Sequence, residues 1–254
     1  MSESPSRGLF VTGTDTGVGK TVIAAAFILY LRAQGVDVAG MKPFQTGFRS
    51  VRTGLRGDAS LLARSAGTKE PSNLINPCSF RDPLAPLVAA DREGRQTSLV
   101  PVEDAFAALA SRHHFVLVEG VGGLGVPLTP GETVADLAVL LGLPLLVVVR
   151  AGLGAISHSV LTAEYAWKKG LEVKGFVLNG AHAPPTLAER TNPAAVEAAT
   201  QLPVLGVLPR LAGRRAQVAA ALGNRVAVWA RLAAALGLPG GGEARTPGGE
   251  PVCV

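Results

Sequence analysis

The sequence predicts an α/β fold in which a mostly parallel sheet carries helices on both faces. Short apolar runs alternate with longer helix-like stretches along the chain, as in successive strand–helix–strand units. The runs are rich in Val and Leu and do not alternate with polar residues, which is typical of strands buried on both faces. Hydrophobic residues make up 48% of the 254 residues and charged residues 17%, a composition that suits a folded chain with one large core.

The predicted elements follow one another in a regular order. A first strand at 9–11 leads through a Gly-rich turn into a helix at 20–34, which Gly35 ends. Further strands are predicted at 36–41, 115–118, 145–149, 173–178 and 204–207. Further helices are predicted at 58–66, 102–112, 134–141, 156–169, 194–201 and 225–236. Because ligands of such sheets bind beyond the carboxyl ends of the strands, we expect the functional residues there.

We expect a single domain over residues 8–239, preceded by a flexible N-terminus at 1–7. Residues 240–254 are rich in Gly and Pro without apolar periodicity, which predicts a disordered tail. The most apolar stretch, 137–149, is too short to span a bilayer. The first seven residues lack the apolar segment of a signal peptide. We therefore expect a cytoplasmic protein with no membrane partner.

The net charge of +5 would suit either nucleic acid or a small anionic substrate. Basic residues are mostly spread singly, apart from pairs at 168–169 and 214–215, whereas a nucleic-acid surface usually clusters them. We expect attraction for phosphate and no nucleic-acid partner. Cys78 and Cys253 are the only cysteines, too few for a disulfide scaffold or a zinc site.

The turn at 13–21 lies between the first strand and the first helix, the place that a phosphate-binding P-loop requires. Backbone N–H groups at such a helix start face the phosphate, and glycine lets the chain approach it closely. Lys20 would reach the β- and γ-phosphates, and the Thr21 hydroxyl would hold Mg²⁺. The first glycine, Gly13, stands one place before the strict pattern, which would put it at Thr14. The alternative is a Gly-rich turn with a surface lysine.

Lys42 follows the second strand, and the adjacent proline prevents that strand from continuing. A lysine at this strand end can stabilise negative charge on a transferred phosphoryl group. The alternative is an ordinary solvated lysine. 

Two acids are candidate metal ligands. Glu119 ends the strand at 115–118 and precedes a Gly-rich segment, the placement of an acid that faces a nucleotide-bound metal. Asp58 lies at the start of a predicted helix, where it could serve either as an N-cap or as a Mg²⁺ ligand. The alternative for Glu119 is an exposed glutamate in a tight turn.

Taken together, these segments resemble the dethiobiotin synthetases, which are P-loop enzymes. The similarity extends from Leu9 to about Leu211. Its most specific motifs are the loop at 13–21 and the Lys-Pro-Phe-Gln-Thr-Gly segment at 42–47. The remaining motifs are at 57–58, 118–123 and 153–158, with Asn179 and Pro209.

The resemblance implies a P-loop nucleoside-triphosphate-binding fold, a homodimer and a set of site residues. Lys20 and Lys42 would be catalytic, and Mg²⁺ would be held by Thr21, Asp58 and Glu119. ATP would be bound by Gly17, Val18, Gly19, Lys20, Thr21, Val22, Asp58, Glu119, Gly120, Val121, Gly122, Asn179, Gly180, Pro209, Arg210 and Leu211. The substrate would contact Thr16, Thr46, Gly123, Gly154, Ala155, Ile156 and Ser157, the last four near the dimer interface. Many members carry Asn in place of Ser157, and residues other than Gly180 after the adenine-side Asn.

The implied reaction joins 7,8-diaminononanoate, CO₂ and ATP to give dethiobiotin, ADP and phosphate. A carbamate forms on one amine, its oxygen attacks the γ-phosphate, and the second amine closes the ureido ring and expels phosphate. Such chemistry needs crowded anions to be neutralised and aligned, and needs no side-chain nucleophile.

Two other classes of P-loop protein are alternatives to this function. A partition or targeting ATPase would use nucleotide as a switch, but it would carry an extra lysine where this sequence has Asp15. An amide-forming synthetase of cobalamin biosynthesis would carry a glutaminase domain with a nucleophilic cysteine, for which we expect no room in this chain.

Overall fold

A six-stranded sheet forms the centre of the molecule in the computed structural model, which describes residues 8–47, 55 and 57–239. Its strands lie in the order β10 (Val204–Pro209), β9 (Val173–Ala181), β8 (Leu145–Arg150), β1 (Gly8–Gly13), β5 (Phe115–Glu119) and β2 (Val38–Met41). Every neighbouring pair is parallel, which confirms the predicted sheet. The predicted tails at 1–7 and 240–254 lie outside the described residues, and the single domain over 8–239 stays a prediction.

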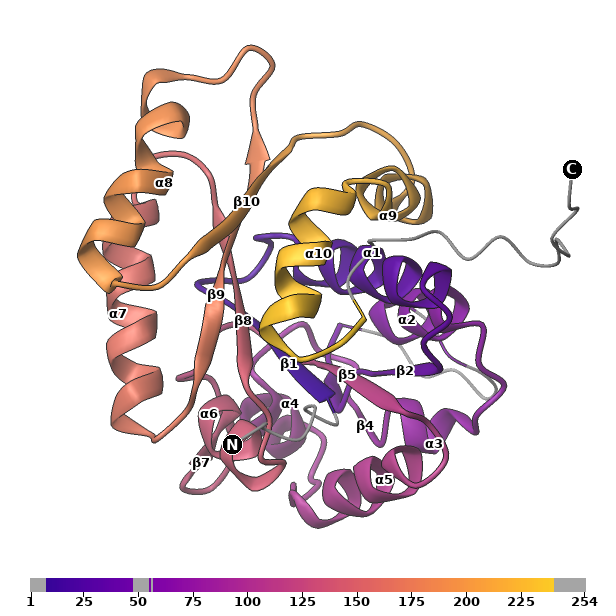
Figure 1. Ribbon diagram of the computed structural model, residues 1–254. Coiled ribbons are helices and arrows are strands. Elements are labelled where there is room, and N and C mark those ends of the chain that lie inside the picture. Colours follow the sequence, from indigo (N-terminus) through magenta and orange to yellow (C-terminus); the bar gives the residue numbers. More distant parts are fainter. Residues whose placement is uncertain (1–7, 48–54, 56, 240–254) are drawn as a thin grey trace, which may run out of the picture.

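Helices cover both faces of the sheet (Figure 1). One face is covered by α1 (Lys20–Ala33), α2 (Gly57–Ala66), α9 (Arg215–Gly223) and α10 (Val226–Ala235). The other is covered by α4 (Pro86–Arg92), α5 (Val100–Ala110), α6 (Val134–Leu140), α7 (Ala155–Lys168) and α8 (Leu187–Thr200). Short elements complete the described fold: α3 (Ser72–Ile75), the strand pair β3 (Phe44–Gln45) and β4 (Cys78–Ser79), and the strand pair β6 (Pro127–Thr129) and β7 (Glu132–Thr133).

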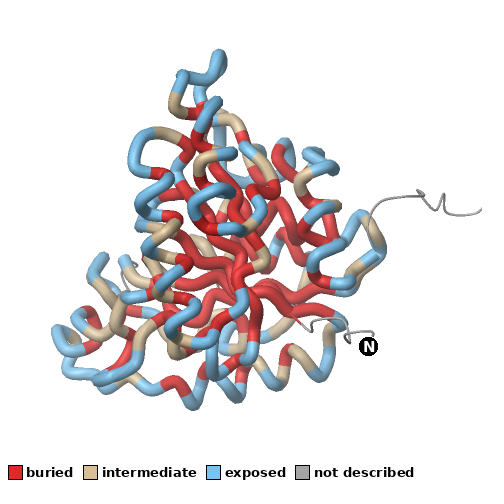
Figure 2. The backbone as a smooth tube through the Cα atoms, turned by 60° about the vertical axis from the view of Figure 1, so that its left-hand side comes forward, coloured by how far each residue is buried: buried red, intermediate tan, exposed pale blue. Residues whose placement is uncertain are grey.

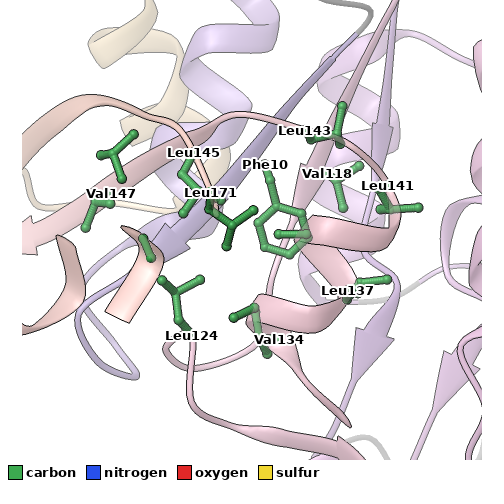
Figure 3. Packing of buried hydrophobic residues seen from close by; sticks show 14 of the residues in the cluster. Phe10, Val118, Leu124, Val134, Leu137, Leu141, Leu143, Leu145, Val147 and Leu171 are labelled. Atoms are coloured by element: carbon green, nitrogen blue, oxygen red, sulfur yellow. The ribbon is translucent and has the colours of Figure 1, made fainter. Parts of the chain in front are cut away.

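The strands are buried on both faces, as their unbroken apolar runs predict. In β1, Leu9 and Val11 pack toward α1, whereas Phe10 packs into the opposite layer. Figure 3 shows Phe10 pointing toward Val134 and Leu137 of α6. Figure 2 shows buried strands at the centre of the molecule and exposed residues along the outer sides of the helices.

The helical prediction was incomplete in several places. Helix α8 begins at Leu187, seven residues before the predicted start, and continues through Pro193. Its start is fixed by Thr186, whose side chain accepts a hydrogen bond from the Glu189 N–H while the Glu189 carboxylate accepts one from the Thr186 N–H. Helices α3, α4 and α9 were not predicted at all. Within the described residues no helix is long and apolar enough to cross a membrane.

Trp229 anchors α10 on α9 and on α1. Its side chain is fully buried, and its indole N–H donates to the Leu222 carbonyl oxygen at 2.7 Å. Its ring lies 5.8 Å from the Phe27 ring, in a tilted arrangement. This residue therefore ties α10 to both α9 and α1.

We expect Trp229→Ala to lower the free energy of unfolding by about 3–5 kcal/mol, because it leaves a large cavity in the core. Urea denaturation followed by circular dichroism measures the change. Val226→Ala, on the same helix at a site that is 49% exposed, is the control and should change the free energy by less than about 0.5 kcal/mol. Similar losses in the two variants would show that Trp229 does not have this anchoring role.

Candidate active site

The turn between β1 and α1 has the backbone geometry of an anion-binding loop. Gly17 and Gly19 have φ angles of 75° and 101°, in the left-handed region that favours glycine. Gly19 is the N-cap of α1 and makes no side-chain cap hydrogen bond, so the first N–H groups of the helix remain available to an anion. Lys20 Nζ donates to the Asp15 carbonyl oxygen at 2.8 Å, which folds its side chain back along the loop.

Side-chain packing explains why the first glycine of the loop is Gly13, one position before the strict P-loop pattern. A Cβ atom on Gly13 would lie 2.7 Å from Val18 Cγ2 and 3.1 Å from Lys20 Cγ. The side chains of the loop therefore pack directly on the Gly13 backbone. A side chain at 13 would force these neighbours to shift, which favours glycine at 13 although the strict pattern would place it at 14.

A buried ion pair lies beside the loop. Lys42 Nζ is 2.6 Å from Glu119 Oε1, and the exposed fractions of the two side chains are 4% and 1%. The Thr21 hydroxyl donates to the same carboxylate oxygen at 2.8 Å, and Lys42 also donates to the Gly120 carbonyl oxygen at 2.9 Å. Because β5 lies between β1 and β2, the strand ends bring these groups together. Neither Lys42 nor Glu119 is the solvated surface residue of the alternative interpretation.

Asp58 faces the same cluster from the first turn of α2. The start of this helix is held by Gln45, whose side-chain oxygen accepts from the Ala59 N–H at 3.0 Å. One Asp58 oxygen lies 3.4 Å from Lys42 Nζ, and the other accepts a hydrogen bond from the Arg215 guanidinium. Asp58 thus lies inside the helix and faces the cluster, where it can act as a ligand.

Burial and the charges of the cluster shift two pKa values. Burial lowers the pKa of the Lys20 ammonium to about 8, and the positive charge of Lys42 acts in the same direction. Burial by itself would raise the pKa of Asp58, but the positive charges of Lys42 and Arg215 outweigh it and hold that pKa below its ordinary value. Asp58 is therefore ionised near neutral pH.

These groups line a cavity of about 520 Å³. It contains twelve of the predicted site residues: Thr16, Gly17, Gly19, Lys20, Thr21, Val22, Lys42, Thr46, Asp58, Glu119, Val121 and Gly122. It is also lined by three residues without a predicted role, Gln45, Pro83 and Arg215. Gln45 belongs to the segment at 42–47, and Arg215 belongs to the basic pair at 214–215. No local signal places Pro83 or Arg215 at this cavity.

The donor set fits a hard divalent cation. Glu119 Oε2 is buried and has no hydrogen-bond partner, which leaves one carboxylate oxygen unused beside the Thr21 hydroxyl. Asp58 supplies a second carboxylate on the same cavity. Within the described residues no group of three or more His, Cys, Asp or Glu side chains could hold a metal, so a cation here would depend on the hydroxyl and on the bound nucleotide as well.

The residues predicted on the adenine side do not line this cavity, but they adjoin the loop. Asn179 Nδ2 donates to the Val18 carbonyl oxygen at 2.9 Å, which joins the end of β9 to the phosphate loop. The Arg210 N–H donates to the Ala181 carbonyl oxygen at 2.7 Å, so the segment 209–211 continues beside β9 next to Gly180.

The remaining predicted substrate residues lie elsewhere on the chain. Gly123 lines a smaller cavity of about 210 Å³ together with Thr14, Leu161 and Tyr165. Gly154 is the N-cap of α7, with a φ of 87°. Ala155, Ile156 and Ser157 form the first turn of that helix, and none of the four lines either cavity.

The fold and the cluster define a P-loop ATP-binding enzyme, and a family described as "AAA domain" matches residues 7–217. Among curated relatives, an "ATP-dependent dethiobiotin synthetase BioD" of Anaeromyxobacter dehalogenans (strain 2CP-C) is 54% identical over 173 residues, 68% of this chain and 76% of the relative. Proteins of the same name from Anaeromyxobacter sp. (strain K) and Bacillus velezensis are 48% and 40% identical, over 80% and 81% of this chain and 90% and 87% of theirs. The chain belongs to the family of ATP-dependent dethiobiotin synthetases.

A solved structure supports the fold alone. The septum site-determining protein MinD from Pyrococcus horikoshii OT3, complexed with Mg-ADP, aligns with a TM-score of 0.52 at 17% identity, over 87% of this chain and 95% of its own. This likeness confirms the P-loop fold class. 

The lowered pKa of Lys20 predicts that ATP binding depends on pH. A bound triphosphate favours the ammonium form, so above pH 8 binding must take up a proton. We expect the dissociation constant for ATP to rise as pH increases beyond about 8, by up to about tenfold per pH unit. Isothermal titration calorimetry in two buffers of different ionisation enthalpy measures both the constant and the proton uptake.

The control is Lys20→Arg, which keeps its charge throughout this range and should show no such dependence. A wild-type dissociation constant that stays constant up to pH 9.5 would contradict the lowered pKa. The same shift makes the folded state more stable as pH rises from about 8 to 10.5, because the unfolded chain holds the proton more tightly there.

Proposed function

We propose that the 520 Å³ cavity binds Mg-ATP and carries out the phosphoryl transfer by which 7,8-diaminononanoate and CO₂ become dethiobiotin. The observation that carries this proposal is the contact of Lys42 and Thr21 with one oxygen of Glu119, next to the phosphate loop. This contact supports the proposal because a cation, a hydroxyl and an acid lie together where we expect the γ-phosphate bound by that loop.

Thr21, Asp58 and Glu119 would hold Mg²⁺. The unused Oε2 of Glu119 and the ionised Asp58 support this assignment. The ion would neutralise charge on the β- and γ-phosphates. A cation on the two carboxylates would compete with Lys42 for them, whereas the Gly120 carbonyl would still accept from its ammonium, so that Lys42 could turn toward the transferred group.

Each lysine would have its own task. Lys20 emerges from the first turn of α1 and would bind the phosphates already present in ATP. Lys42 would stabilise charge that develops as the carbamate oxygen attacks the γ-phosphate and ADP leaves. The second amine then displaces phosphate from the resulting anhydride and closes the ureido ring. Both lysines are buried, which helps to exclude water from a carbamate and an anhydride that hydrolyse readily.

The diamine would extend from the γ-phosphate past Thr16 and Thr46 toward Gly123. A nine-carbon substrate spans about 10 Å, and its carboxylate would meet the start of α7 (Gly154, Ala155, Ile156, Ser157) from a second subunit. Exposed apolar side chains on this surface support a homodimer, with Leu153 90%, Leu161 64% and Ile156 39% exposed. Adenine would be bound beside the loop by Asn179, Gly180 and the 209–211 segment. The enzyme would act in the cytoplasm.

A coupled assay for ADP release tests the function. Diaminononanoate, bicarbonate and Mg-ATP are supplied together and then omitted one at a time. We expect release to require all of them and to disappear in Lys20→Ala, whose loop cannot hold the phosphates. ADP release that does not depend on the diamine would contradict the proposal.

Lys42→Gln should lower turnover by about a hundredfold or more while changing the ATP dissociation constant by less than about threefold. Glutamine keeps a hydrogen-bond donor for Glu119 but lacks the charge needed during transfer. Turnover at saturation and direct ATP titration are measured on the same preparation. If affinity falls and turnover does not, Lys42 is only a ground-state binding residue.

Mixing two inactive variants tests the shared site. Lys20→Ala removes phosphate binding, and Ser157→Trp blocks the start of α7 at an exposed position, whereas a bulky residue at the buried Ala155 would disturb the core. We expect partial recovery after subunit exchange, because some mixed dimers regain one intact site. No recovery after verified exchange would place the whole site within one chain.

A further inference from the structure

Arg215 joins two distant parts of the chain across the candidate active site. It is the first residue of α9, and its guanidinium pairs with Asp58 of α2, 157 positions away in the sequence. The Arg215 side chain is 62% exposed and also lines the 520 Å³ cavity.

The charges that line the cavity are almost entirely paired with each other. Lys42 contacts Glu119 and Asp58, and Arg215 contacts Asp58. A divalent cation on the two carboxylates would compete directly with these contacts. Lys42 and Arg215 would then lose their carboxylate partners inside a cavity that contains a polyanion, where a phosphate oxygen can replace them.

The position of Arg215 suits such an exchange. Its helix is fixed, because Ala219, Leu222 and Gly223 are buried against α1 and its neighbours. Its side chain is long and exposed, so the guanidinium can move without a change in the backbone. A positive charge at a helix N-terminus is unfavourable unless an anion lies nearby, and Asp58 is that anion here. Arginine also presents a planar fork of donors that matches phosphate.

We propose that Arg215 is a third phosphate-binding cation, which leaves Asp58 for an oxygen of the terminal phosphate when Mg-ATP enters. This inference rests on the proposed function, since it places the nucleotide in the same cavity. It assigns Arg215 to binding of the triphosphate, beside the loop and Lys42.

Binding measurements on purified full-length chain test the inference. Dissociation constants for Mg-AMP-PNP and Mg-ADP are measured by calorimetry for the wild type, Arg215→Gln and Arg214→Gln. Arg214 is the matched control, because it is the adjacent arginine at the same helix terminus, is exposed and does not line the cavity. We expect Arg215→Gln to weaken Mg-AMP-PNP binding by about tenfold to a hundredfold, and Mg-ADP binding by less. Arg214→Gln should change both by less than about threefold.

Other outcomes would overturn the inference. Unchanged or tighter Mg-AMP-PNP binding in Arg215→Gln would show that Arg215 only competes with the metal for Asp58. Equal losses in the two variants would show a general effect of charge. Equal losses for Mg-AMP-PNP and Mg-ADP in Arg215→Gln would place the contact away from the terminal phosphate. If the wild type binds neither nucleotide, the proposed ATP site fails, and this inference fails with it.

Discussion

The contact between Lys42 and Glu119 is the constraint on which the site depends. Two opposite charges lie 2.6 Å apart with almost no solvent access, and burying them has a desolvation cost that only close geometry and further hydrogen bonds can offset. The Thr21 hydroxyl and the Gly120 carbonyl provide those bonds. The strand order β1, β5, β2 is therefore tied to the chemistry, because moving any one of these strands would separate a buried charge from its partners.

The parts of the site that follow strands could be predicted from the sequence. Lys42 and Glu119 each come directly after an apolar run, and parallel strands end at one edge. Arg215 could not be found this way, because its contact with Asp58 joins helices far apart in the chain and α9 has no strong apolar pattern. The start of α8 could have been predicted from the sequence, since Thr186 and Glu189 form a capping box and α8 continues through Pro193.

The fold by itself does not determine the reaction. The MinD structure shares the arrangement at 17% identity, whereas relatives named dethiobiotin synthetase are up to 54% identical. The candidate site residues of this chain lie on the loops beyond the strands, where Lys42 contacts Glu119. Sheet and helices hold these loops in place, and function is decided by such sites and not by the fold.

The close packing of Val18 on Gly13 has an evolutionary consequence. A methyl group at 13 would have to occupy space that the Val18 side chain already fills. The two positions should therefore change together among descendants of this chain: a larger residue at 13 becomes tolerable only when 18 becomes smaller. We therefore expect correlated natural variation at these two sites, and a loop with its first glycine at 14 would be a separate solution that single substitutions do not easily reach from this one.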